Sequence, residues 1–329
     1  MIRQVGPTTI LLLSTSALGS TGTEPDRLSL ARLPTPIDRF DRIRDGWTVL
    51  VKRDDLTGSA LSGNKVRKLE YLLAEAQDHG ARRVLTCGGI QSNHCRATAV
   101  AAARLGLGCE LFLRTNEPPG PDDPVTGNLK LDRIVGATVR FITPEQYRDR
   151  MALMADAAGA DGYVIPEGGS NALGAWGYIR AVDEMAAQWQ TPPSSIVCAT
   201  GSGGTLAGLA IGLRRRGLDV PLHGVAVCDD AVYFQAIVDR ISAEATKRWP
   251  DLPRIRSGDV TIIEGYKGRG YGLSTTEEEA SIGFVARASG LILDPVYTGK
   301  AFRALLCEPE RFGPRPLFVH TGGIFGLLA

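Results

Sequence analysis

The chain has 329 residues, of which 43% are hydrophobic and 22% are charged. This composition is typical of a globular protein that can bury one large core or two linked ones. The 37 basic residues nearly balance the 36 acidic ones, so the chain has no net field to attract nucleic acid or an anionic membrane surface. After the N-terminus, no apolar run approaches the roughly 20 residues of a membrane span. These features favour a small molecule as the partner.

The cysteines and the N-terminus bear on where the protein works. The six cysteines lack the spacing of a structural zinc site, so we predict reduced thiols and no metal site. They lie at positions 87, 95, 109, 198, 228 and 307. Arg3, followed by the apolar stretch 8–17, faintly resembles a secretory signal. Because that stretch is short, we expect residues 1–27 to form a poorly ordered extension of a cytoplasmic protein.

The first predicted elements lead up to a helix. Leu33–Pro36 predicts an extended segment, because each proline disfavours helix at the residue before it. Trp47–Lys52 predicts a strand. Between residues 65 and 76, apolar residues recur at three- and four-residue spacing, which predicts one face of a helix. Ser62 and Asn64 are candidate caps for its start.

Strands and helices then alternate to the C-terminus. The predicted strands span 83–87, 109–114, 137–142, 163–166, 195–200, 223–228, 260–263 and 317–320. The predicted helices cover about 94–105, 128–135, a segment ending near 158, 176–189, a segment after Gly204, 234–240 and 281–288. This order predicts an α/β fold with open, twisted, parallel sheets between helical layers. Ligands in such folds bind at the carboxyl ends of the strands.

Lys65 follows Ser62, Gly63 and Asn64 at the predicted start of a helix. A lysine at this end opposes the helix dipole, which favours anions there, so its unfavourable position needs an explanation. A surface lysine extending from the first turn is the ordinary explanation. A desolvated lysine also titrates readily and can form an imine with a carbonyl group. Lys65 is therefore a candidate nucleophile.

Two further segments each follow a predicted strand and precede a helix. Residues 88–94 (GGIQSNH) carry four consecutive hydrogen-bonding side chains, more than the cap by Ser92 or Asn93 would need. Residues 200–205 (TGSGGT) predict a turn whose backbone can approach a small phosphate group, or simply a tight connection. A dinucleotide turn is excluded, because Leu206 replaces its third glycine, and no GKS or GKT sequence marks a nucleotide P-loop.

Two later segments place tyrosines among glycines. They are residues 265–272 (GYKGRGYG) and 293–300 (LDPVYTGK). Each of these tyrosines could bind a ligand. The alternative is that it packs at the rim of the molecule with its hydroxyl in water.

Together these segments resemble the D-cysteine desulfhydrase and 1-aminocyclopropane-1-carboxylate (ACC) deaminase family. Its members are pyridoxal-phosphate (PLP) enzymes of the tryptophan-synthase-β type, also called fold type II. The resemblance runs from about Leu28 to Gly323. It is carried by residues 52–55 (KRDD), 61–70 (LSGNKVRKLE), 88–98 (GGIQSNHCRAT), 165–173 (IPEGGSNAL), 201–205 (GSGGT) and 294–301 (DPVYTGKA).

The resemblance implies a role for each matching residue. Lys65 should bind PLP as an imine and later remove the α-proton of the substrate. The catalytic residues implied are Lys65, Ser92, Tyr271 and Tyr297. The cofactor should be bound by Asn64, Lys65, Asn93 at the phenolic oxygen, Tyr297 against the ring, Thr298 near the ring nitrogen, and the phosphate-binding residues Gly201, Ser202, Gly203, Gly204 and Thr205. The substrate should be bound by Gln91, Ser92, Asn93, His94 and Tyr271.

Thr298 separates two branches of the family. ACC deaminases carry a glutamate at this position, which would keep the ring nitrogen protonated, whereas a hydroxyl favours a neutral ring. A neutral ring suffices for β-elimination, in which the leaving group takes the electrons. The residue therefore favours the desulfhydrase branch, and residues 91–98 and 227–234 look most like plant-type D-cysteine desulfhydrases.

We therefore expect conversion of D-cysteine to pyruvate, ammonia and hydrogen sulfide. The alternatives are ACC deamination, β-replacement, a cysteate lyase if Lys267 and Arg269 face the substrate, and a non-catalytic PLP-binding protein. We expect a larger domain from residues 28–65 and 176–329, and a smaller α/β domain from residues 66–175. PLP should lie in the cleft between them, and the family implies a homodimer.

Overall fold

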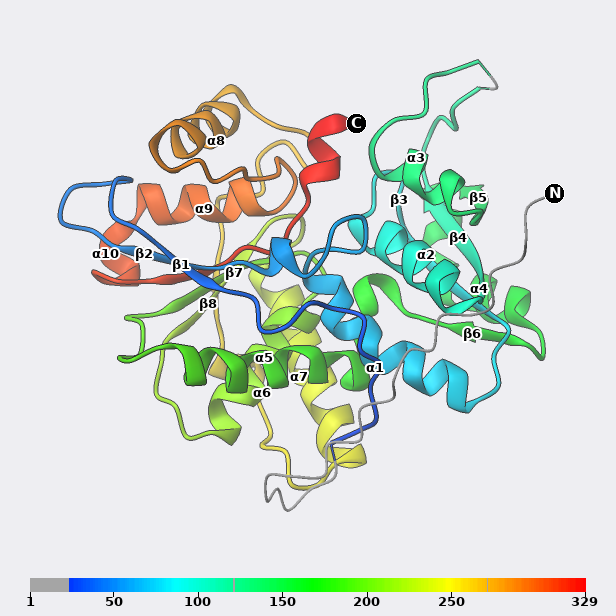
Figure 1. Cartoon of the computed structure of the whole chain (residues 1–329), viewed down its shortest axis with the longest axis horizontal. Helices are drawn as coiled ribbons and strands as arrows, with labels where there is room; N and C mark the ends of the chain where they lie inside the picture. Colours follow the sequence, from blue (N-terminus) through cyan, green and yellow to red (C-terminus); the bar gives the residue numbers. More distant parts are fainter. Residues whose placement is uncertain (1–23, 121, 271) are drawn as a thin grey trace.

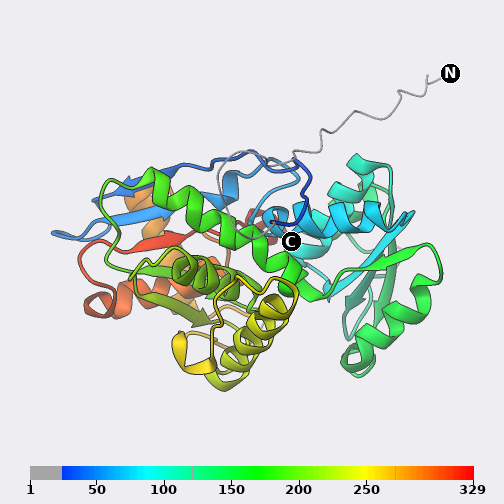
Figure 2. The same ribbon diagram turned by 90° about the horizontal axis from the view of Figure 1, so that it is seen from below.

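The computed structural model describes residues 24–120, 122–270 and 272–329. Predictions for the N-terminal stretch up to residue 23 and for Tyr271 lie outside these ranges. Two lobes lie side by side in the described chain, each built on its own sheet (Figures 1 and 2). No helix in these ranges is long and apolar enough to cross a membrane. All six cysteines are free of disulfide bonds.

The larger lobe contains a six-stranded sheet in the order β1-β2-β10-β7-β8-β9. Its strands are β1 (Ile37–Phe40), β2 (Val49–Lys52), β7 (Ile196–Thr200), β8 (Leu222–Ala226), β9 (Thr261–Ile263) and β10 (Leu317–Val319). The neighbours pair in parallel, except that β1 runs antiparallel to β2. The prediction of wholly parallel sheets was wrong here, because the short hairpin strand β1 has no apolar run to reveal it.

Helices cover both faces of this sheet (Figure 1). One face carries α5 (Ala172–Gln188), α6 (Gly204–Arg215) and α7 (Ala231–Arg248), and the other carries α8 (Thr276–Ser289), α9 (Thr298–Cys307) and α10 (Pro309–Phe312). Side chains alternate between two cores, since Ile196 packs on one side and Val197 on the other. The predicted three-layer architecture is confirmed, although α9 and α10 were not predicted.

The smaller lobe contains a parallel sheet in the order β5-β4-β3-β6. Its strands are β3 (Arg83–Gly89), β4 (Gly108–Arg114), β5 (Thr138–Ile142) and β6 (Gly162–Val164). Helices α2 (Asn93–Leu105) and α3 (Gly127–Ile134) cover one face, and α4 (Arg150–Ala158) covers the other. Each face has its own apolar core. The predicted division into a larger domain of residues 28–65 and 176–329 and a smaller domain of residues 66–175 stays a prediction.

Helix α1 (Asn64–Asp78) lies between the lobes and packs against both α2 and α5. Arg67 is buried and donates hydrogen bonds to Asp54 Oδ2 at 2.8 Å and Glu184 Oε2 at 3.0 Å. Residues two positions apart on a helix point in different directions, whereas residues three apart share a face. Anchoring Arg67 therefore turns Lys65 and Lys68 toward the opposite side of α1.

Candidate active site

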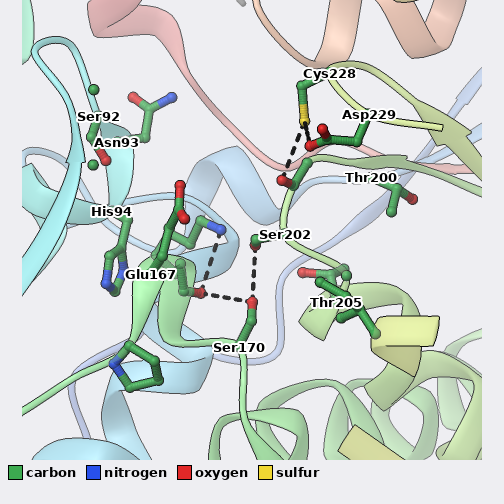
Figure 3. A pocket seen from close by; sticks show the side chains of 18 of the residues that line it. Ser92, Asn93, His94, Glu167, Ser170, Thr200, Ser202, Thr205, Cys228 and Asp229 are labelled. Carbon is green, nitrogen blue, oxygen red and sulfur yellow. Dashed lines mark hydrogen bonds between the residues drawn. The ribbon is translucent and has the colours of Figure 1, made fainter. Parts of the chain in front are cut away.

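A cavity of about 980 Å³ lies where the carboxyl ends of strands from both sheets meet (Figure 3). Ser92, Asn93 and Glu167 line it from the smaller lobe. The turn 201–203 and Tyr297 line it from the larger lobe. This position agrees with the general rule for ligand sites in open α/β sheets.

Lys65 lies in the first turn of α1 and lines this cavity. Its Nζ donates to Gly168 O at 3.5 Å. Burial lowers the pKa of Lys65 to about 8, while the charge of Glu167 acts in the opposite direction. A large share of the amine is therefore neutral near pH 8, as an imine-forming lysine requires.

The start of α1 differs from the prediction. Gly63 is the N-cap residue, and no side chain caps the helix, so the predicted caps Ser62 and Asn64 were wrong. Gly63 has a φ of +91°, and a Cβ there would lie 2.8 Å from Thr321 O. The backbone N–H of Asn64 donates to the same oxygen at 3.1 Å. A glycine is needed because the chain approaches the end of β10 this closely.

The turn between β7 and α6 forms one wall of the cavity. Gly203 has a φ of +74° and precedes α6, whose first N–H groups have no partners within the helix. Thr205 Oγ1 accepts a hydrogen bond from Asn64 Nδ2 at 3.0 Å, and the Ser202 and Ser170 hydroxyls lie 2.9 Å apart (Figure 3). A Cβ at Gly201 would lie 2.9 Å from Tyr297 Cε1, so Tyr297 packs directly on this turn.

Lys68 does not line the cavity itself but lies directly behind its lining, and no role was predicted for it. It is 1% exposed, and its Nζ donates to Gly168 O at 3.2 Å and to Ser170 Oγ at 3.3 Å. A Cβ at Gly204 would lie 2.9 Å from this Nζ. Burial, followed by the charge of Lys65, holds the pKa of Lys68 well below its ordinary value. Without an anion the neutral amine is therefore favoured, and an anion bound beside Lys68 and the N-terminus of α6 would stabilise the charged form.

The turn between β3 and α2 forms the opposite wall. Ser92 Oγ accepts from Cys95 N at 3.2 Å, so Ser92 both caps α2 and lines the cavity with Asn93. His94 also lines the cavity, and its Nε2 lies 2.8 Å from Thr86 Oγ1. Burial, with the charges of Lys65 and Lys68, holds the pKa of His94 well below its ordinary value. His94 therefore stays neutral at physiological pH.

Three predicted site residues among the described ones do not line the cavity, and one of them is Gly204, which packs against Ser170. Gln91 is turned toward α3, where its Oε1 accepts from Asn128 N at 2.8 Å and its Nε2 donates to Thr126 O at 3.3 Å. Thr298 is buried, and its hydroxyl donates to Asp294 Oδ1 at 2.6 Å. The cavity lining includes none of the three.

Several charged side chains complete the lining, and sequence patterns had not indicated them. They are Arg114, Arg148, Arg150, Glu167, Asp229 and Arg240. Arg150 pairs with Glu167 at 3.3 Å, and Tyr147 lies between Arg114 and Arg150, which are 4.7 and 4.8 Å from its ring centre. Glu167 and Asp229 lie in segments that carry the family resemblance, but no site role was predicted for them, and the four arginines lie outside those segments.

The chain belongs to the family of pyridoxal-phosphate dependent enzymes, whose profile matches residues 28–322. Among its relatives, the bifunctional D-cysteine desulfhydrase/1-aminocyclopropane-1-carboxylate deaminase of Arabidopsis thaliana, a mitochondrial protein, is 44% identical, over 91% of this chain and 78% of that protein. The D-cysteine desulfhydrase of Klebsiella pneumoniae is 40% identical, over 92% of this chain and 95% of that protein.

Solved structures agree with this assignment. An ACC deaminase homologue superposes with a TM-score of 0.82 at 39% identity, covering 92% of this chain and 93% of the other. A hydrogen sulfide-producing enzyme of Fusobacterium nucleatum gives a TM-score of 0.64 at 13% identity, covering 89% and 96%, and supports the fold alone. The predicted family, fold type II and the PLP cofactor are confirmed.

The cavity residues fit PLP. Lys65 offers an amine of lowered pKa for the aldehyde group. Lys68 and the first N–H groups of α6 offer buried hydrogen-bond donors for the phosphate. Tyr297 offers an aromatic face for the ring. When bound, PLP supplies an electron sink that stabilises negative charge at the substrate Cα.

Proposed function

We propose that this enzyme is a lyase that removes the β substituent of an amino acid. Its substrate is D-cysteine, which with one water gives pyruvate, ammonia and hydrogen sulfide. The observation that carries the proposal is the lowered pKa of Lys65, about 8, in a cavity lined by residues of both lobes. Relatives that cover almost the same length carry this activity in their names.

Lys65 would hold the cofactor and, when its amine is free, would take the proton from the substrate Cα. A lysine amine with an ordinary pKa of about 10.4 would be almost wholly protonated at neutral pH. The lowered pKa of Lys65 makes the neutral, proton-accepting form available under these conditions. Lys65 therefore acts both as the anchor of the cofactor and as the base.

The β3–α2 turn binds the substrate carboxylate. Ser92 and Asn93 lie at the N-terminus of α2, where backbone N–H groups and the helix dipole favour a negative charge. Gln91 supports this turn from behind by its hydrogen bonds to α3. His94 adds no charge, since its pKa is lowered. Tyr271 completes the substrate-binding set.

Thr298 supports elimination over opening of a cyclopropane ring. Its hydroxyl is neutral and donates to Asp294, so this position supplies no carboxylate that would keep the ring nitrogen of PLP protonated. The remaining site roles proposed are those of Asn64 and the turn 201–205 with the phosphate, and of Tyr297 with the ring.

Two other activities have specific support. The Arabidopsis relative is named for ACC deamination as well as for desulfhydration. The arginines 114, 148, 150 and 240 along the cavity favour a substrate with an acidic leaving group, such as the sulfite of cysteate. The loop cations considered for that role, Lys267 and Arg269, are exposed and do not line this cavity.

We also propose that the enzyme is a cytoplasmic homodimer whose smaller lobe closes on the substrate. Apolar side chains exposed toward the end of the chain support a subunit interface there. They include Leu273, Phe284, Ile292, Ile324 and Leu328.

Release of 2-oxo acids tests the proposed activity. Purified enzyme would be given D-cysteine, L-cysteine, β-chloro-D-alanine, cysteate or ACC, with Lys65→Ala as the control. We expect rapid pyruvate release from D-cysteine and its loss in the variant. If pyruvate were released faster from cysteate, cysteate would replace D-cysteine as the proposed substrate. If 2-oxobutanoate from ACC were the main product, ACC would replace it. If pyruvate were released only slowly and the enzyme turned over rapidly once a second nucleophile was added, the activity would be β-replacement.

A further inference from the structure

Asn128, the second residue of α3, is fully buried behind the β3–α2 turn. Its Nδ2 donates to Asn93 Oδ1 at 3.1 Å and to the backbone oxygen of Gln91 at 3.0 Å. Its Oδ1 accepts from Arg96 Nε at 3.1 Å. Asn128 therefore connects a charged side chain of α2 to an amide that lines the cavity.

The neighbours of Asn128 determine which way its amide points. An arginine can only donate hydrogen bonds, so the atom facing Arg96 must be the oxygen of Asn128. A backbone carbonyl can only accept, so the atom facing Gln91 O must be the nitrogen. These two contacts fix the amide independently of each other. Since the nitrogen also faces Asn93, the atom that Asn93 presents to it must be an oxygen.

Arg96 is itself held in place. It is 1% exposed, donates to the carbonyl oxygens of Ala60 and Ser62, and stacks on Phe325 with its guanidinium carbon 4.9 Å from the ring centre. Arg96 therefore cannot rotate to suit a flipped Asn128 amide, because the rotation would leave buried donors and acceptors unpaired.

The consequence reaches the cavity through Asn93. With its oxygen turned to Asn128, its amide nitrogen is on the cavity side, as Figure 3 shows. This group can then donate a hydrogen bond but cannot accept one. A ligand oxygen opposite it must be an acceptor, and an anionic oxygen gives the strongest bond.

We propose that Arg96 and Asn128 are positioning residues that make Asn93 an obligatory hydrogen-bond donor to the phenolate oxygen of PLP. This inference rests on the proposed function only in taking Asn93 as the residue beside that oxygen. The two positioning residues touch neither cofactor nor substrate. They act by excluding the flipped amide, which would present an oxygen to an oxygen.

Asn128→Asp tests this polarity. The substitution keeps the shape of the side chain and the hydrogen bond from Arg96, but it places an oxygen against Asn93, which must flip. We expect kcat/KM for D-cysteine to fall about 10- to 100-fold, because a hydrogen bond to a charged oxygen is lost. In the loaded protein without substrate, the absorbance should shift toward the neutral-phenol form of the cofactor. That spectral shift reports the oxygen itself and needs no turnover.

Asn128→Ala distinguishes polarity from packing. Alanine leaves Asn93 free to keep either orientation, so its spectral shift should be smaller than that of Asn128→Asp. A purely structural role predicts the reverse, because alanine removes more atoms and leaves Arg96 Nε unpaired. An equal or larger shift in Asn128→Ala would overturn the proposal.

A double variant keeps the test valid if Asn128→Asp does not fold. Asn93→Leu removes the donor, so adding Asn128→Ala to it should cause no further spectral shift. A further shift in the double variant would contradict the proposal. As a matched control, Ser242→Ala in α7 removes the buried hydroxyl that accepts a hydrogen bond from Ile255 N, and should lower stability without altering the spectrum. Because the spectra require no turnover, they decide this inference even if D-cysteine is not the substrate.

Discussion

The two walls of the cavity are built differently. On the larger lobe, the β7–α6 turn depends on the main chain, with Gly203 at a φ of +74° and Gly204 packed against Ser170. On the smaller lobe, the β3–α2 turn depends on side-chain hydrogen bonds to α3, above all those of Asn128. The first wall should therefore be sensitive to the volume of a substitution, and the second to its polarity.

The largest effect is expected from added volume on the first wall. In Gly204→Ala, the new Cβ would lie 2.6 Å from Ser170 Oγ and 2.9 Å from Ser170 Cα, which is main chain and cannot easily move. We expect the affinity for PLP to fall at least about 100-fold, because the start of α6 must shift away from the phosphate. Cofactor titration of the apoprotein measures this loss.

Gly258→Ala is the matched control for that substitution. A Cβ at Gly258 has no neighbour within 4 Å, so its affinity for PLP should equal that of the unaltered protein. Equal affinities for PLP in Gly204→Ala and Gly258→Ala would mean that the first wall tolerates added volume. That result would contradict the difference expected between the two walls.

Lys68→Met tests the charge that the same wall offers. We expect an affinity for PLP about 10- to 100-fold weaker, since the phosphate loses a charged donor. The apoprotein should be no less stable, because methionine replaces an amine whose burial is costly, as its lowered pKa indicates. Exposed Lys130→Met should change neither property. If Lys68→Met weakened PLP binding and also destabilised the apoprotein by a similar free energy, Lys68 would instead have a packing role.

The smallest effect concerns charge behind the second wall. Asp132, one turn beyond Asn128, is fully buried, and neither carboxylate oxygen has a hydrogen-bond partner among the described residues. Burial raises its pKa to about 7, against the attraction of Arg96. The folded state therefore binds a proton more tightly than the unfolded state, so stability is lost as pH rises from about 4 to about 7.

Asp132→Asn should remove this pH dependence. At pH 8 we expect its free energy of unfolding to exceed that of the unaltered protein by about 1–2 kcal/mol. This is less than the roughly 4 kcal/mol of the full pKa shift, because the new amide also lacks partners. At pH 4 the variant should be the less stable protein by about 2–3 kcal/mol, because the amide still lacks partners while the carboxyl of the unaltered protein is protonated there. Exposed Asp156→Asn should change nothing at either pH. A gain of the same size at both pH values would contradict the assignment.

The sequence allowed most of the fold to be predicted where apolar spacing was regular. The helix at residues 65–76 and the strands around it followed from periodicity. Helix α9 was missed because it begins without a side-chain cap, directly after the motif of Tyr297. Strand β1 was missed because four residues at a sheet edge show no clear alternation.

The site was predictable only where a motif marked it. Lys65, Asn93 and the turn 201–205 stand in motifs, and the structure places them around one cavity. Lys68 and Asn128 were not given roles, because their importance comes from burial and contacts with distant segments. Such contacts depend on tertiary packing, which local patterns do not encode.

The most direct test of the account is to find the lysine that carries the cofactor. Borohydride reduction of the loaded enzyme converts the imine to a stable amine, and tryptic mapping then locates it. We predict a modified peptide spanning residues 54–67, uncleaved at Lys65, and no adduct in Lys65→Ala. An adduct on Lys68, or one that persists in Lys65→Ala, would contradict the account.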